Sequence, residues 1–163
     1  MSFNRLILLI SLFGVGFASP ALAKFTPQQV KAVYIYRIAS FVHWTRDAQM
    51  PVINICVPDD SEIREILENI TKDKEIRNKP ILVGSQNCDV LYISKKESLN
   101  MIDISQKQAI SISDIHDFVE LGGVIELTTL GGRIKPKVNL NNVGEFTISS
   151  NFLRVADIVG GDK

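Results

Sequence analysis

The stretch from Val30 to Trp44 constrains the fold most, because it is apolar on both sides of the helix that its spacing predicts. One stripe at i, i+3 and i+4 spacing consists of Val30, Val33, Tyr34, Ile38 and Phe41. The other side carries Ala32, Ile35, Ala39 and Val42. A helix this apolar is normally buried on two sides, one of them against its own sheet. The second side either completes the core of a small domain, the more common outcome, or meets a partner chain.

The start of this helix is marked by a capping box, Thr26-Pro27-Gln28-Gln29. Pro27 occupies the first helical position, where its missing N–H leaves no hydrogen bond unmade. The preceding residues 1–23 have the features of a secretory signal peptide: Arg5, an apolar run and an Ala21-Leu22-Ala23 cleavage site. We therefore expect a signal peptide at 1–23 and one exported α/β domain at 24–163.

Composition limits the classes of partner. Lysine and arginine balance aspartate and glutamate, with a formal net charge of +0 and no basic cluster. A nucleic-acid partner is therefore not expected, because such binding depends on a basic surface. The apolar run of the signal peptide is shorter than the roughly 20 residues that span a bilayer. We expect no direct membrane insertion of the mature chain, which should be exported.

Cys56 and Cys88 are the two cysteines of the chain. An even pair in an exported protein predicts a disulfide, which would contribute roughly 3–4 kcal/mol in the chain-entropy model. Two free buried thiols are the alternative in this compartment. A metal site has less support, because no second pair of ligands accompanies either cysteine.

Short β-branched runs alternate with amphipathic segments along the rest of the chain. The expected strands are 51–57, 80–83, 88–93 and 108–112, followed by a hairpin of 124–128 and 135–140 around Gly131-Gly132. The expected helices after the first are 63–70, a short one ending near Ile104, a brief one at 115–119, and Ser149–Val159. This alternation predicts a single-domain three-layer αβα sandwich with a mostly parallel sheet and a C-terminal β-hairpin.

Motifs of catalysis, metal binding or phosphate binding are not found in the mature sequence. We therefore expect no catalytic residue, no metal and no cofactor. His43 beside Trp44 could hold a small aromatic or cationic ligand. The alternative is that Trp44 closes the edge of the core while His43 is solvated.

Several short motifs, in their order and spacing, resemble the YfiR family of periplasmic regulators. They are Lys31–Tyr36, Phe41–Trp44, Asn54–Cys56, Cys88–Ser94, Gly122–Glu126, Val138–Leu140 and Ile148–Ser150 with Leu153 and Ala156. The resemblance implies an exported α/β domain, often a homodimer. It also implies a regulator that represses an inner-membrane diguanylate cyclase of the YfiN type, and so controls cyclic di-GMP and biofilm formation. Cys56 and Cys88 fall where the family places a disulfide.

A chain without reactive groups but with surplus apolar helix surface should act by binding. We expect Ile148, Phe152 and Leu153, with apolar residues of the first helix, to contact the partner protein. Other classes stay open: a periplasmic small-ligand receptor that uses His43 and Trp44 and acts on a histidine kinase or receptor, and an enzyme whose polar groups come from distant segments.

Overall fold

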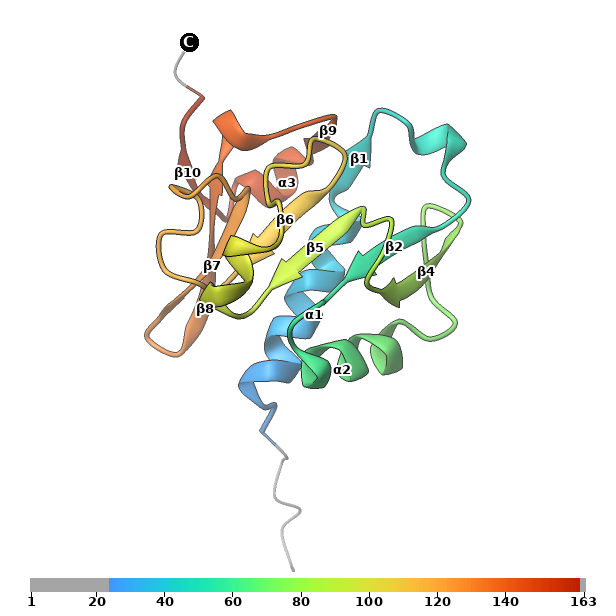
Figure 1. The fold of residues 1–163 in the computed structure, drawn as a ribbon, viewed down its shortest axis with the longest axis horizontal. Coiled ribbons are helices and arrows are strands. Elements are labelled where there is room, and N and C mark those ends of the chain that lie inside the picture. The colour runs from blue at the N-terminus through green and yellow to red at the C-terminus, as the bar shows by residue number, and fades with distance from the viewer. Residues whose placement is uncertain (1–23, 162–163) are drawn as a thin grey trace, which may run out of the picture.

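The computed structural model describes residues 24–161, so the expected signal peptide at 1–23 lies outside the described residues. An eight-stranded sheet forms the middle of the domain, with the strand order β10-β8-β7-β6-β5-β2-β4-β3 (Figure 1). The strands are β2 (Ile53–Cys56), β3 (Glu75–Ile76), β4 (Lys79–Gly84), β5 (Val90–Ile93), β6 (Ile110–Ser113), β7 (Ile125–Leu130), β8 (Arg133–Asn139) and β10 (Asp157–Val159). Neighbouring strands are parallel, except β7 with β8 and β3 with β4.

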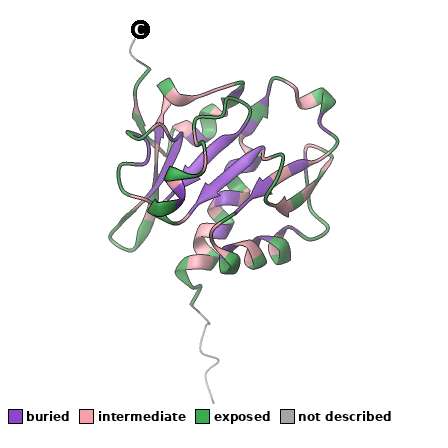
Figure 2. Cartoon of the chain, in the orientation of Figure 1, coloured by how far each residue is buried: buried purple, intermediate pink, exposed green. Residues whose placement is uncertain are grey.

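Two helices, α1 (Pro27–Ser40) and α2 (Ser61–Thr71), cover the same face of this sheet (Figure 1). The predicted capping box is confirmed: the Thr26 hydroxyl accepts the Gln29 N–H, and the Gln29 side chain accepts the Thr26 N–H. Asp60 caps α2 by accepting the Ile63 N–H. Alternate residues of the central strands point into the core below the two helices, and β5 and β6 are buried along their whole length (Figure 2).

The other face of the sheet is covered by short segments instead of long helices. A 3₁₀ turn, η2 (Lys96–Asn100), and the turns before β7 lie there. A second apolar cluster fills this side; its members are Cys56, Leu91, Ile93, Cys88, Leu99, Ile102, Ile104 and Ile115. The predicted three-layer α/β sandwich with a mostly parallel sheet is confirmed. The helices expected at 115–119 and up to Ile104 are instead turns and one 3₁₀ turn.

The C-terminal hairpin is also confirmed. β7 pairs antiparallel with β8 in the register Ile125↔Val138 to Leu130↔Arg133, and Gly131 and Gly132 have the positive φ that the turn needs. β10 pairs with Lys137–Asn139 of β8 but not with Pro136. On this side β8 therefore has no strand partner at Pro136, which suits a residue that has no backbone N–H to donate.

The first predicted helix ends earlier than the sequence pattern indicates. Val42–Trp44 is a strand, β1, which pairs antiparallel with β9 (Phe146–Ile148) in a separate two-stranded sheet. The Phe41 carbonyl accepts the Ser149 N–H next to this pair. Tertiary pairing with a segment far along the chain thus overrides the helical spacing.

The last helix, expected at Ser149–Val159, is wrong over most of its length. α3 spans Ser150–Leu153, and Asp157–Val159 forms β10. The β-branched residues Ile158 and Val159 suit an extended backbone, and β8 offers an unpaired edge for them. The short α3 leaves part of the neighbouring surface uncovered.

Candidate functional site

An apolar groove of about 430 Å³ lies between α1, β8 and α3. Its lining consists of Val33, Tyr34, Arg37, Ile38, Phe41, Ile134, Pro136, Asn151, Phe152 and Val155. Three segments that are far apart in the sequence therefore build it. The groove is the first candidate site because it gathers apolar side chains, some of which are exposed to solvent.

The groove exists because α1 is apolar on two sides. Ala32, Ile35 and Ala39 are fully buried toward the sheet, as a core helix requires. Val33, on the other side, is 39% exposed and forms part of the groove. One side of α1 is therefore core, and the other side is partly uncovered.

The base of the groove is held in place by specific contacts. The rings of Phe41 and Phe152 stack with centroids 5.8 Å apart, and Phe152 is only 5% exposed. The Tyr34 hydroxyl donates to the Ile134 carbonyl at 3.1 Å, which joins α1 to the edge of β8. These contacts position the wall side chains, so the groove is preformed.

One of the three predicted partner-binding residues lines this groove. Phe152 lines it, whereas Leu153 is half-buried and packs against the core. Ile148 is half-buried in β9, opposite Val42 of β1. Val155, which also lines the groove, is 64% exposed.

Sequence reasoning missed Val33 and Val155 as surface residues. Val33 belongs to the apolar stripe of the first helix, so its type was visible but its exposure was not. Val155 falls within the longer helix predicted at Ser149–Val159. The break after Leu153 turns it to the surface.

The predicted small-ligand residues lie on opposite sides of β1. His43 is exposed, whereas Trp44 is 3% exposed, because successive strand residues alternate between faces. The Arg77 guanidinium lies 5.5 Å from the centroid of the Trp44 ring and covers it. Neither residue lines the apolar groove. This arrangement fits the alternative in which Trp44 closes the core.

Arg77 is itself held by Asp47, which also binds Lys79. Partial burial raises the pKa of Asp47, but the hydrogen bonds and positive charges of Arg77 and Lys79 outweigh it, so the pKa is lowered overall. This cluster ties the β1 region to the start of β4.

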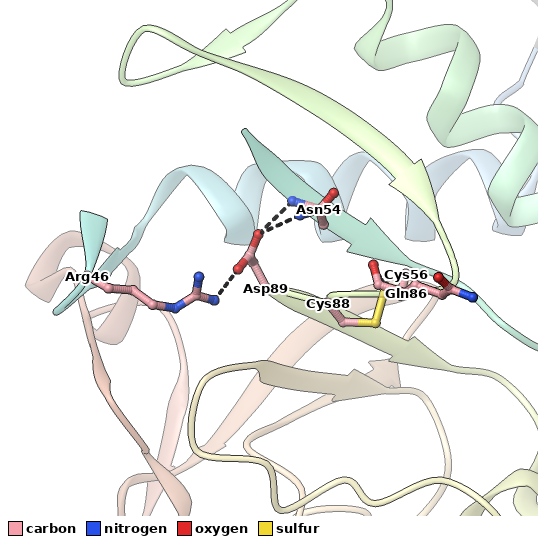
Figure 3. Close-up of a disulfide and its surroundings, with 6 residues drawn as sticks. All are labelled: Arg46, Asn54, Cys56, Gln86, Cys88 and Asp89. Atoms are coloured by element: carbon pink, nitrogen blue, oxygen red, sulfur yellow. Dashed lines mark hydrogen bonds and ion pairs between the residues drawn. A yellow bond between two sulfur atoms is a disulfide. The ribbon is translucent and has the colours of Figure 1, made fainter. Parts of the chain in front are cut away.

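The predicted disulfide joins the last residue of β2 to the segment just before β5. Cys56 and Cys88 are bonded, with their Cα atoms 5.5 Å apart. Beside them, the buried Asp89 carboxylate pairs with Arg46 and accepts the Asn54 N–H at 2.8 Å (Figure 3). A polar hollow of about 480 Å³ opens there, lined by Arg46, Asn54, Ser85, Gln86, Asn87, Cys88, Gln106 and Gln108.

Carboxylates also gather where β2, β5 and β6 end, the edge at which α/β sheets commonly bind ligands. Asp59 accepts the Ser94 and Lys95 N–H groups, and Asp60 caps α2. Asp114 accepts the Tyr92 hydroxyl at 2.9 Å, and burial together with this carboxylate raises the pKa of Tyr92. These oxygens thus hold turns and helix starts together.

Residues 24–161 contain neither a cluster of metal-binding side chains nor a helix that could span a membrane. No group of three or more His, Cys, Asp or Glu side chains in this range is arranged to hold a metal ion. No helix in the same range has the length and apolarity needed to cross a membrane.

Comparison with known proteins identifies the family. No curated protein shows significant sequence similarity to the chain. Residues 28–157, which run from the second residue of α1 to the first residue of β10, match the sequence model of a family described as YfiR/HmsC-like. That family consists of periplasmic regulatory proteins. The chain belongs to the YfiR/HmsC-like family.

Proposed function

We propose that the protein binds the periplasmic domain of an inner-membrane diguanylate cyclase of the YfiN type through the apolar groove and holds the cyclase inactive. Membership of the YfiR/HmsC-like family supports a regulatory role in this pathway. Loss of the contact would release the cyclase, raise cyclic di-GMP in the cytoplasm and favour biofilm formation.

The observation that carries this proposal is the partly uncovered apolar lining of a preformed groove. Val155 is 64% exposed and Val33 is 39% exposed, beside a base fixed by Phe41 and Phe152. Fully burying a wholly exposed apolar side chain contributes about 1.5–3 kcal/mol, and the exposed fractions of Val155 and Val33 together amount to about one such side chain. A preformed groove adds little ordering cost to the binding step.

Repression needs only a difference in affinity between two states of the cyclase. A coupling free energy of about 2–3 kcal/mol shifts such an equilibrium strongly. Covering both exposed valines supplies a free energy of this order if the inactive state alone offers a matching surface. No reactive group is needed for this mechanism.

The disulfide supports the proposed compartment. Disulfides persist in oxidising compartments such as the periplasm, and Cys56 and Cys88 are bonded here. Export would depend on the predicted signal peptide at 1–23. A homodimer, which the family resemblance also implies, stays a prediction that analytical ultracentrifugation tests.

The test is a binding measurement with one groove variant and one matched control. Val155→Asp places a carboxylate in the groove at an exposed position, so folding is preserved. Leu121→Asp makes the same kind of change at a residue 53% exposed that lies beside η2 on the other face of the sheet. Phe152→Asp is unsuitable, because its side chain is buried and the fold would suffer.

Calorimetric titration with the purified periplasmic domain of the cyclase gives the affinities. We expect Val155→Asp to weaken binding at least tenfold, since an unpaired carboxylate covered by an apolar surface costs more than about 1.4 kcal/mol. Leu121→Asp should bind like the wild type. Equal affinities for all three proteins would reject the groove as the repressor surface.

A further inference from the structure

The groove lies where a further helix of the α layer would belong. α1 and α2 cover part of one face of the sheet, whereas α3 near β8 is only four residues long. Helices packed side by side in one layer have axes about 8–10 Å apart. A helix laid against α1, β8 and α3 would therefore continue the existing layer.

The edge of β8 at the groove is poorly suited to an added strand. The Ile134 carbonyl already accepts the Tyr34 hydroxyl, and Pro136 has no N–H to donate. Residues two apart in a strand direct their backbone groups to the same side. Beyond them β10 pairs with Lys137–Asn139. A partner segment that fills the groove must therefore bind through its side chains, as a helix in a groove does.

The charge of Arg37 indicates which kind of helix would suit the groove. Among the described residues that line the groove, Arg37 is the one that carries a charge. Arg37 is exposed, and within residues 24–161 no carboxylate lies within ion-pairing distance of it. Lys135, on the neighbouring strand, is already paired with Asp157. An acidic residue on the occupant would find an unpaired guanidinium at the groove wall.

We infer that the groove receives an amphipathic helix of the partner that carries an aspartate or glutamate facing Arg37. This inference rests on the proposed function and specifies the segment of the cyclase that is bound. Val33 and Arg37 are four residues apart on α1, so they lie about 6 Å apart along one side of the helix. The acidic residue should accordingly lie one turn from the apolar residues that cover Val33 and Val155.

The first experiment locates the bound segment. A photoreactive benzoylphenylalanine replaces Val155 in the full chain, and a second protein carries it at Leu121 as the control. After irradiation with the periplasmic domain of the cyclase, mass spectrometry identifies the joined peptides. We expect position 155 to join a cyclase segment with apolar residues at helical spacing and an acidic residue one turn away. Position 121 should join none.

The second experiment tests the charge. Arg37→Glu should weaken binding at least tenfold, and changing the acidic residue of the joined segment to arginine should restore most of the loss. Lys96→Glu makes the same charge reversal at an exposed residue of η2 and should leave the affinity unchanged. Circular dichroism of each variant confirms that the fold is kept.

The outcomes separate this inference from the proposed function. If Val155→Asp weakens binding but Arg37→Glu does not, the groove binds the cyclase and the acidic helix is rejected. If position 155 joins a second copy of this chain or an extended cyclase segment, the helix is also rejected. If neither variant weakens binding, both the inference and the proposed surface are wrong.

Discussion

The disulfide region and the apolar groove differ in how completely the chain covers or pairs their side chains. Around Cys56–Cys88, the buried Asp89 carboxylate is paired with Arg46 and accepts the Asn54 N–H. In the groove, Val33 and Val155 remain exposed on a base of stacked rings. The first region satisfies its polar groups within the chain, whereas the second leaves apolar surface that only another molecule can cover.

This difference separates stability from binding. A covalent bond and paired polar groups fix the connections between β2, β4 and β5, so changes there should act on the free energy of unfolding. Changes at exposed groove residues should act on affinity, because those side chains contribute little to the folded core. Measurements of the free energy of unfolding and of affinity can therefore distinguish the two regions.

Removing the disulfide should lower stability most. The double variant Cys56→Ala, Cys88→Ala opens a loop with a sequence separation of 32 residues. The expected loss in the free energy of unfolding is about 3–4 kcal/mol, because the unfolded chain regains conformational freedom. Urea denaturation measures it. Affinity for the cyclase, measured under conditions in which the variant is folded, should not change. A tenfold loss of affinity would contradict the idea that the disulfide region acts on stability alone.

Asp89→Ala should have the next largest effect. It leaves the Asn54 N–H without its acceptor and Arg46 without its partner, at a cost of about 1–3 kcal/mol. Asp103→Ala is the control, since Asp103 is exposed and bonds to the neighbouring Ser105. Urea denaturation of both should show a loss for Asp89→Ala alone. Equal stabilities would mean that the buried carboxylate is not needed.

The smallest expected effect is a pH dependence of the stability that Asp47 contributes. The pKa of Asp47 lies below its ordinary value of 3.8, because Arg77 and Lys79 favour the charged carboxylate. A lowered pKa contributes stability that is complete above the ordinary pKa and is lost as the pH falls through the lowered one. Asp47→Asn should therefore be less stable than the wild type near neutral pH, and the difference should shrink below about pH 4. Thermal unfolding between pH 3 and 7 measures this; a constant difference would contradict the assignment.

Local sequence signals predicted much of this fold because their causes lie within a few residues. The capping box at Thr26 needs only Gln29, and the β7–β8 turn needs only Gly131 and Gly132. Signals of long-range pairing are absent from such windows. The local spacing therefore predicts a helix through Trp44, although this residue pairs with β9. It also predicts a helix through Val159, although this residue pairs with β8.

The candidate site was predictable only in part for the same reason. The surplus of apolar surface on the first helix and the place of Phe152 could be inferred from spacing. The groove also needs Ile134 and Pro136 from β8, and its exposed wall needs the chain to leave α3 at Leu153. Tertiary packing decides both.

Repression of the cyclase through the groove is tested by measuring the concentration of cyclic di-GMP in living cells. Cells that carry the cyclase and lack this protein are supplied with the wild type, Val155→Asp or Leu121→Asp, each checked for equal periplasmic abundance. We expect the wild type and Leu121→Asp to lower cyclic di-GMP, whereas Val155→Asp should leave it high. Equal lowering by all three proteins would contradict repression through the groove.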